Sequence, residues 1–371
     1  MIGAQRILVY RLGSLGDTCV ALPALRIVRQ AYPEARVTLF TNLPVSEKTA
    51  PAVALLEGMG LVDDYLAYPV GVRDIWALAR LFWRLRRRRF QVAVNLTAWR
   101  GEFALRRDAR LFRLCGIRRR LGFKEEEARA LRFDAAGQAE HEAKRLLRRV
   151  AELGQADLAD QRWYNLDLTT EELQRAGIEL NKGGINGDYL AFSLGTKVST
   201  NDWEQQNWRQ LIRVLGGAYP RLGCVFVGAA GEAERVRDCL EDWPGPKLNL
   251  CGQTSPRGSA TTLAAARVFV GHDSGPMHLA AAVGTPCVAI FSARNPPGQW
   301  FPLGQGHEVL YHKVSCALCG LDECLVEQKR CIRGVTVDEV VAAVMRQLER
   351  SEERSASDRR NRQQILPENV R

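Results

Sequence analysis

The sequence predicts an α/β protein built from two doubly wound, parallel-sheet domains. Short apolar runs typical of buried parallel strands alternate with helical patterns along most of the chain. The length of 371 residues exceeds the usual size of one domain. The alternation also restarts after the polar, glycine-rich segment 181–188. We therefore expect domains at 1–182 and 188–350, and the charged, aromatic-poor segment 351–371 is predicted to be a disordered tail.

The N-terminal segment has the pattern of a βαβ unit. Arg6 to Tyr10 and Arg36 to Thr41 are expected strands, and Thr18 to Ala31 has helical periodicity. The loop at 11–17 (RLGSLGD) has glycines for a tight turn but lacks the G-x-G-x-x-G spacing of a dinucleotide site. Asp17 ends this loop, where it suits a helix N-cap. The same position faces the carboxyl edge of a sheet and suits a general base, and the sequence favours neither role over the other.

The stretch from 269 to 291 (FVGHDSGPMHLAAAVGTPCVAIF) is the most informative part of the second domain. A buried strand is expected up to Val270, then a polar turn, a helix at Met277 to Val283 that starts after Pro276, and a strand up to Phe291. Open α/β sheets bind ligands at the carboxyl ends of their strands, and a helix start offers free N–H groups to a phosphate. An ordinary crossover is the alternative, but packing alone does not require so polar a turn.

Three other expected strands of this domain also end in loops of small and polar residues. These strands lie at Tyr189 to Leu194, at Cys224 to Val227 and near 249–254. Because the carboxyl ends of parallel strands meet at one edge of a sheet, this layout predicts a nucleotide site.

The net charge of +10 and the pI of about 9.3 favour an anionic partner. Arginines gather in the N-terminal half, notably at 84–89 (RLRRRR) and 118–120, and suggest a surface for anionic groups, although solvated helix faces explain most of them. No nucleic-acid-binding module accompanies this charge, so nucleic acid is the least favoured partner. Nothing approaches the ~20 apolar residues of a membrane span, and no signal-peptide pattern is present, so a cytoplasmic protein is expected.

Four of the ten cysteines cluster near the C-terminus, at Cys316, Cys319, Cys324 and Cys331. Their C-x2-C start is compatible with zinc, but the later spacings fit no common zinc finger or ribbon. A structural or redox-tolerant loop is the favoured interpretation, and no metal site is predicted. The other cysteines lie mostly in apolar segments and are expected to be small buried hydrophobes.

Three segments together resemble glycosyltransferase family 9, the family of ADP-heptose:lipopolysaccharide heptosyltransferases. They are RILVYRLGSLGDTCVALPALRIVRQAYPEARVTLF, GTKVSTNDWEQQNW and GHDSGPMHLAAAVGTPCVAIFSARNPPGQWFPLG. The similarity spans roughly residues 6–348, without a matching motif in 43–190. It implies the GT-B architecture, in which two Rossmann-like domains face a cleft, with the acceptor on the N-terminal domain and the nucleotide sugar on the C-terminal one.

The resemblance also implies roles for individual residues. Asp17 is expected to be the general base, and Lys197 to stabilise the charge that grows on the leaving diphosphate, without a metal ion. Glu232 is expected to bind the ribose hydroxyls. The family often carries a second lysine where this chain has Asn201, so Lys197 acts alone or the donor differs. The residues expected to bind the donor are Ser14, Gly16, Thr196, Glu232, Asp273, Ser274, Gly275, Pro276, Met277 and His278.

Three functions are compatible with these residues. The first is inverting, metal-independent transfer of a heptose from a nucleotide-heptose, expected to be ADP-heptose, to a lipopolysaccharide core acceptor, with no cofactor. The second keeps the fold but uses another nucleotide sugar for O-antigen, capsule or protein glycosylation, and Asn201 favours it. The third is a non-catalytic nucleotide-sugar-binding protein, against which Asp17, Lys197 and Asp273 argue. The first function predicts an anionic, membrane-anchored glycolipid acceptor and hence a cytoplasmic protein in transient, peripheral contact with the inner leaflet of the inner membrane.

Overall fold

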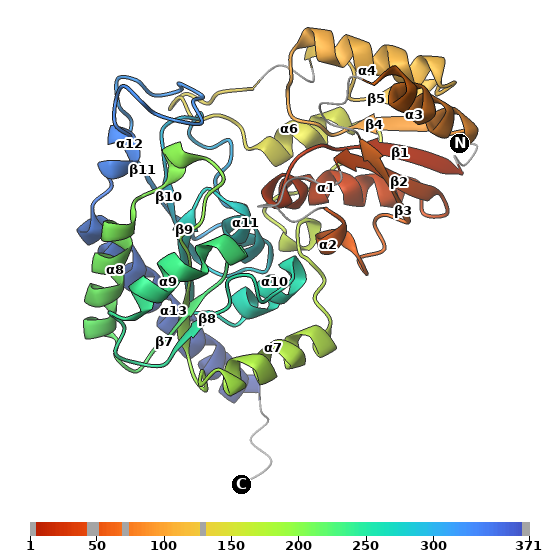
Figure 1. Cartoon of the computed structure of the whole chain (residues 1–371). Coiled ribbons are helices and arrows are strands. Elements are labelled where there is room, and N and C mark those ends of the chain that lie inside the picture. Colours follow the sequence, from red (N-terminus) through yellow and green to blue (C-terminus); the bar gives the residue numbers. More distant parts are fainter. Residues whose placement is uncertain (1–4, 43–51, 69–73, 127–130, 366–371) are drawn as a thin grey trace.

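The computed structural model describes residues 5–42, 52–68, 74–126 and 131–365, and it contains two parallel β-sheets, each with helices on both faces (Figure 1). The first sheet has five strands in the order β3-β2-β1-β4-β5, and the second has six in the order β11-β10-β9-β6-β7-β8. Every strand pairing within the two sheets is parallel. The predicted pair of doubly wound parallel sheets is therefore confirmed.

The first sheet and its helices occupy the N-terminal part of the chain. β1 and β4 are buried along most of their length because helices cover both faces of this sheet. The elements are β1 (Arg6–Tyr10), α1 (Leu15–Ala31), β2 (Arg36–Asn42), α2 (Val53–Leu56), β3 (Asp64–Tyr68), α3 (Ile75–Arg87), β4 (Val92–Asn95), α4 (Glu102–Leu114), β5 (Arg119–Leu121) and α6 (Glu142–Arg149).

The second sheet follows a linking region that contains η1 (Gln161–Trp163) and α7 (Thr170–Lys182). The central strands of this sheet, β6, β9 and β10, are buried along their whole length. The elements are β6 (Tyr189–Ser193), η2 (Ser199–Asn201), α8 (Gln205–Ala218), β7 (Gly223–Phe226), η3 (Ala230–Glu232), α9 (Ala233–Leu240), β8 (Lys247–Asn249), α10 (Pro256–Ala264), β9 (Val268–His272), α11 (Gly275–Ala282), β10 (Cys287–Phe291), β11 (Glu308–Tyr311), α12 (Arg330–Arg333) and α13 (Val337–Ile365).

One continuous apolar cluster joins the two sheets. It contains residues of β1 and α1 from the first half, such as Val9 and Val20, and residues of α11 and β9 from the second half, such as Leu279 and Phe269. A separate cluster under α8, α9 and α13 covers the far face of the second sheet. Another lies under α3 and α4 on the far face of the first sheet. Because α1 and α11 share this core, the two halves of the chain pack directly against each other.

The sequence also predicts a short helix at Thr169 to Ala176 with a capping box at its start. The observed helix α7 is longer than this and packs against the second half of the chain. The capping box predicted at its start is confirmed: the Thr169 N–H donates to Glu172, and the Glu172 N–H donates to the Thr169 hydroxyl. The helix continues past Ala176 to Lys182. Arg257 of α10 binds the Glu172 carboxylate with two hydrogen bonds of 2.5 and 2.7 Å and holds the pKa of that carboxyl at about 2. The division at 182 and 188 stays a prediction, but α7 lies beside α10 (Figure 1).

The C-terminal helix also differs from the prediction. α13 runs through Ile365, so residues 351–365 are helical where a disordered tail is expected, and residues 366–371 lie outside the described part. Segment 351–365 is rich in arginine, glutamate, glutamine and serine and contains neither proline nor glycine, so it can prolong a helix that tertiary packing has already started. In the described part of the chain, no helix is both long enough and apolar enough to cross a membrane.

Candidate functional site

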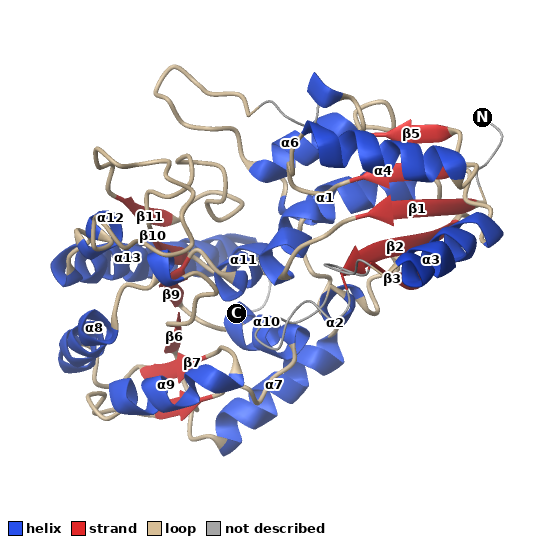
Figure 2. Ribbon diagram, turned by 45° about the horizontal axis from the view of Figure 1, so that its top comes forward, coloured by secondary structure: helices blue, strands red, loops and turns tan. Residues whose placement is uncertain are grey.

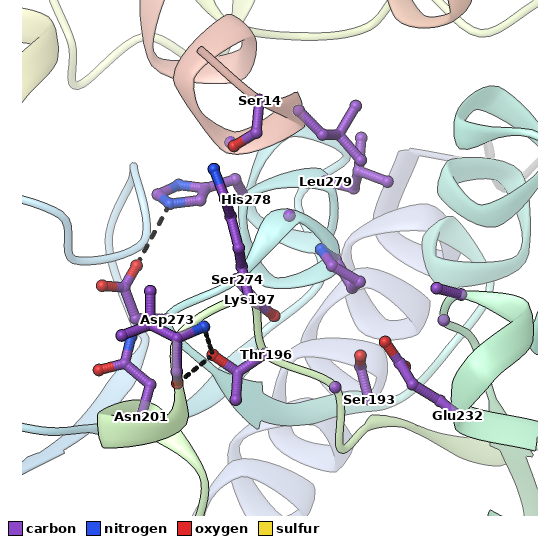
Figure 3. A pocket seen from close by; sticks show the side chains of 18 of the residues that line it. Ser14, Ser193, Thr196, Lys197, Asn201, Glu232, Asp273, Ser274, His278 and Leu279 are labelled. Atoms are coloured by element: carbon purple, nitrogen blue, oxygen red, sulfur yellow. Dashed lines mark hydrogen bonds and ion pairs between the residues drawn. The ribbon is translucent and has the colours of Figure 1, made fainter. Parts of the chain in front are cut away.

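A cavity of about 840 Å³ lies where the carboxyl ends of the strands of the second sheet meet the start of α1 (Figure 3). Loops that follow β6, β7, β8, β9 and β10 supply most of its lining, as expected for an open α/β sheet. The first domain supplies the segment Ser14 to Asp17. The sequence predicted a site at this edge, and the structure shows that both domains line it.

Asp17 lies in the first turn of α1, and it caps that helix. Its Oδ2 atom accepts hydrogen bonds from the Ser14 N–H at 2.8 Å and from the Ser14 hydroxyl at 3.1 Å. Gly13 faces the same carboxylate so closely that a Cβ atom there would lie 2.4 Å from the Asp17 Cγ atom. Asp17 thus takes part in capping as the third residue of the helix, but the N-cap residue of α1 is Ser14 and not Asp17, the residue that the sequence suggested. The carboxylate remains partly exposed to the cavity, so the role of general base stays a prediction.

A buried arginine lies beneath Asp17. Arg11 is only 2% exposed, and its guanidinium donates to the Asp17 Oδ1 atom at 3.1 Å, to the Asp17 carbonyl oxygen and to the Leu96 carbonyl oxygen at 2.5 Å. Burial lowers the pKa of the Arg11 guanidinium below its ordinary value, while the neighbouring Asp17 opposes this shift. Arg11 thus fixes the orientation of the Asp17 carboxylate and supplies the positive charge next to it. The sequence shows Arg11 only as the residue that follows β1.

The two domains touch at the edge of the cavity through a glycine. A Cβ atom on Gly16 would lie 2.6 Å from the Cδ2 atom of His278, and one on Gly275 would lie 3.0 Å from Leu15. The start of α1 therefore meets the start of α11 with no space for a side chain at either glycine. Gly16, predicted to bind the donor, has a packing role in this structure as well.

The turn before α11 presents a helix start to the cavity. Ser274 is the N-cap residue, and its buried hydroxyl has no hydrogen-bond partner among the described residues. The His278 Nε2 atom lies 3.7 Å from the Asp273 Oδ1 atom, and both residues line the cavity with Gly275. The free N–H groups of this first turn are suited to an anion.

Met277 is the one predicted donor-binding residue whose side chain does not line the cavity. It is fully buried in the core shared by the two domains. Only the main chain of Met277 can therefore face a ligand. The Met277 side chain points into the core because this residue lies on the side of α11 that packs against the sheet.

Lys197 and Thr196 come from the loop after β6. The Lys197 side chain extends into the cavity (Figure 3), and no carboxylate in the described part of the chain is placed within ion-pair distance of it. The Thr196 hydroxyl donates to the Val198 carbonyl oxygen at 3.2 Å and so shapes the loop. An unpaired ammonium group in a cleft is available to an anionic ligand.

Glu232 lies at the far end of the same cavity, between two glycines. Cβ atoms on Gly195 and Gly228 would fall 1.9 and 2.1 Å from its carboxylate, so a side chain at either position would displace the Glu232 carboxylate. The Glu232 Oε2 atom is buried and has no hydrogen-bond partner within the described ranges. Burial raises the pKa of the Glu232 carboxyl above its ordinary value. An unsatisfied buried acceptor facing a cavity is suited to a ligand hydroxyl.

Asn201 is buried beside the cavity. Its Oδ1 atom accepts a hydrogen bond of 2.5 Å from the Ser292 hydroxyl, just after β10. The amide therefore ties η2 to the end of a neighbouring strand. This position supplies no positive charge to the cavity.

Sequence reasoning did not single out several residues that line the cavity. Trp300 packs edge-on against His278, with ring centroids 6.4 Å apart. Arg294 lies at the mouth and binds the carbonyl oxygens of Gly320 and Leu321. Their only signal in the sequence is their position in the loop after β10, which does not say which side chains turn inward. The other lining residues not predicted are Leu15, Ser193, Gly195, Val198, Gly228, Ala229, Ala230, Gly231, Arg235, Gly252, Thr254, Pro256, Ser259, Leu279 and Asn295.

The four C-terminal cysteines lie in or beside a segment that packs on the Lys197 loop. The Thr200 hydroxyl donates to the Leu321 carbonyl oxygen at 3.0 Å, and the Lys329 ammonium group donates to the Asp202 carbonyl oxygen at 3.2 Å. All ten cysteines are free thiols, and no described group of three or more His, Cys, Asp or Glu side chains is arranged to hold a metal ion. In this structure the cysteine-containing segment packs against the Lys197 loop and supports it.

Comparison with known proteins gives a consistent result. The sequence model of glycosyltransferase family 9 (heptosyltransferase) matches residues 78–329. The chain is 27% identical over 334 residues to lipopolysaccharide heptosyltransferase 1 of Pseudomonas aeruginosa, covering 86% of this chain and 87% of that protein.

Solved structures share the fold. A family 9 glycosyl transferase from Veillonella parvula aligns with a TM-score of 0.71 at 18% identity, and ADP-heptose lps heptosyltransferase II of E. coli aligns with 0.66 at 19% identity. Each alignment covers 94% of this chain and 99% of the other. Two parallel-sheet domains facing a cleft are the GT-B architecture that the resemblance implies.

Proposed function

This chain belongs to glycosyltransferase family 9, and we propose that it transfers a heptose from ADP-heptose to a lipopolysaccharide core acceptor. As a member of this family it is a glycosyltransferase. One observation supports the proposal above the others: Asp17 of the first domain and Lys197 of the second line the same cavity. A candidate base and a candidate phosphate-binding group thus face one space, as a transfer between two substrates requires.

The donor would lie along the edge of the second sheet. Its diphosphate would accept hydrogen bonds from the N–H groups at the start of α11 and from Lys197. Its ribose hydroxyls would satisfy the buried Glu232 Oε2 atom. The cavity of about 840 Å³ is within the usual range for a small-molecule site. This orientation directs the sugar toward α1.

The transfer step would use Asp17 on the acceptor side. The acceptor hydroxyl gives its proton to the Asp17 carboxylate as its oxygen forms a bond to the anomeric carbon from the face opposite the diphosphate. The bond between that carbon and the diphosphate oxygen breaks, and the electron pair leaves with ADP, so the configuration inverts. Lys197 and the α11 N–H groups are fixed beforehand where the charge grows, and for that reason we propose a reaction that needs no metal ion.

A second candidate keeps this chemistry and changes the sugar. Asn201 favours it, because the buried amide replaces a second cation with a neutral group that is already bonded to Ser292. The substrate would then be another nucleotide sugar, for O-antigen, capsule or protein glycosylation. The same contacts with the diphosphate and ribose would apply.

Ligand-dependent unfolding distinguishes these candidates. A nucleotide that binds only the folded protein stabilises it by about 2.7 kcal/mol at a concentration of about 100 times its Kd. We expect ADP to raise the unfolding temperature and UDP and GDP to leave it unchanged, and we expect Asp273→Ala to reduce the ADP effect. Mass spectrometry of a core acceptor incubated with ADP-heptose should then show the added heptose. A response to UDP or GDP alone would favour the second candidate, and a response to no nucleotide would refute the donor site.

A further inference from the structure

Two helices cover the face of the first sheet that points away from the second domain (Figure 2). The C-terminal ends of α3 and α4 meet on this face. The Arg86 guanidinium donates to the Leu114 carbonyl oxygen at 3.1 Å, and the Cys115 thiol lies 3.8 Å from the Phe82 carbonyl oxygen. Both helices follow strands of one parallel sheet, so both begin at its carboxyl edge, where Asp17 also lies.

The outward side of α3 alternates tryptophan and arginine. Trp76, Arg80, Trp83 and Arg87 are spaced by four, three and four residues, which places them in one stripe. Leu85, on the opposite side, is completely buried. The stripe therefore points to solvent, and Trp76 and Trp83 are 73% and 57% exposed. Two tryptophans this exposed on one stripe are unusual for a surface that contacts only water.

The outward side of α4 repeats the spacing. Phe103, Arg107, Arg110 and Leu114 are again separated by four, three and four residues, opposite the buried Phe112. Phe103 is 80% exposed and Leu114 is 66% exposed. Both helices thus present exposed apolar side chains and arginines on their outward sides, and the Arg107 guanidinium is in addition bound to the Asp108 carboxylate at 2.8 and 2.9 Å. We call these eight positions on α3 and α4 the Trp–Arg face.

Positive charge predominates on and beside this face. No acidic residue occurs within α3. At the end of α3 lies a hollow of about 650 Å³, whose lining contains four arginines and no acidic residue. The arginines of this hollow are Arg86, Arg87, Arg89 and Arg118. A guanidinium group matches the geometry of a phosphate with two parallel hydrogen bonds.

We propose that the Trp–Arg face docks on the surface of an anionic phospholipid membrane. Tryptophan side chains settle at the level of the lipid headgroups, arginines bind their phosphates, and an amphipathic helix lies in the plane of that interface. A second copy of this chain fits less well, because pairing two such faces brings arginine against arginine. The inference deepens the proposed function, since a membrane-anchored acceptor would be met by the edge of the sheet that carries Asp17.

Vesicle flotation tests the assignment. The full chain is mixed with vesicles of phosphatidylglycerol and phosphatidylcholine, and separately with vesicles of phosphatidylcholine alone. We expect flotation with the anionic vesicles only, and weaker flotation as salt is added. Arg80→Gln/Arg87→Gln should reduce the partition coefficient about 30-fold, from about fivefold for each arginine near an anionic surface. Trp76→Ser/Trp83→Ser should reduce it at least about tenfold.

Matched variants away from the Trp–Arg face serve as controls. Leu325→Ser/Val326→Ser changes two apolar residues that are more exposed than Trp76 and Trp83, and Arg175→Gln/Lys182→Gln removes two exposed charges from α7. Both should bind vesicles like the unchanged protein. All substituted side chains lie at the surface, so unchanged thermal unfolding is expected and confirms that each variant is folded.

The outcomes separate this inference from the proposed function. Loss of flotation in the two Trp–Arg variants, with unaltered transfer to an acceptor that lacks its lipid chains, supports the docking surface. Equal flotation of all variants, no flotation of the unchanged protein, or a preference for an oligonucleotide over the vesicles would overturn it. A protein that floats but transfers no heptose would retain the docking surface and lose the proposed function.

Discussion

Replacing Asp17 by asparagine separates its two roles. The asparagine amide oxygen can still accept the hydrogen bond from the Ser14 N–H, so the start of α1 is retained. The substitution removes the negative charge that lies 3.1 Å from the buried Arg11 guanidinium. It also removes the only group of this side chain that can take up a proton at neutral pH. The substitution therefore has little effect on helix capping, but it abolishes proton transfer to this side chain.

The magnitudes follow from these contacts. Losing a charge-assisted hydrogen bond to a buried arginine costs about 1–3 kcal/mol, and a protein of ordinary stability, about 5–15 kcal/mol, remains folded after this loss. A general base contributes about 10²–10⁴ to the rate, which is about 3–5 kcal/mol of activation free energy. We therefore expect Asp17→Asn to be somewhat less stable, to bind ADP normally and to turn over about 10²–10⁴ times more slowly.

The assay combines ADP titration by calorimetry with kcat measured at saturating donor and acceptor. Ser14→Ala is the matched control, because it deletes the hydroxyl that donates to the same carboxylate at 3.1 Å and leaves the charge in place. Its kcat should fall by no more than about tenfold, since it loses one neutral donor. If folded Asp17→Asn keeps a kcat within this range, Asp17 is a helix cap and not the base.

Three further predictions concern the interface, the donor site and acid stability. Gly16→Ala forces a methyl group against the His278 ring, so it should lower the free energy of unfolding by about 1–3 kcal/mol and lower turnover. The control Gly177→Ala, whose added methyl group meets no atom within 4 Å, should not destabilise the protein, and equal melting curves for the two variants would contradict the reasoning. Glu232→Gln should raise the melting temperature at pH 7, because it removes a charge that burial disfavours, and should weaken ADP binding about 10–100-fold. Burial lowers the pKa of His141 from 6.5 to about 4, so on acidification the unfolded state takes up this proton before the folded state does, and the free energy of unfolding should fall as the pH is lowered from 6.5 to about 4. His141→Asn should reduce this pH dependence, measured by urea titrations at several pH values, and an unchanged dependence would contradict the reasoning.

Much of the fold was predictable because its signals are local. Apolar runs of strand length, followed by helical periodicity and broken by proline and glycine, define parallel βα units without knowledge of distant contacts. The turn before α11 and the loop with Lys197 were recognisable as parts of one site, since carboxyl ends of parallel strands must meet at one edge. The length of α7 and the helical continuation of α13 were not predictable from the sequence, because capping and packing determine where a helix ends.

The sequence by itself determined the α/β class, the two parallel sheets and the loops that line the cavity, because residue order and periodicity dictate these. Tertiary structure decided what no local pattern contains. The tertiary fold places Arg11 beneath Asp17 and packs Gly16 against His278 across the domain interface. It also buries the Met277 side chain in the core, while the neighbours of Met277 line the cavity. It also decided that Trp76 and Trp83 point to solvent, since a helical stripe becomes a surface only when the opposite stripe is buried against a sheet.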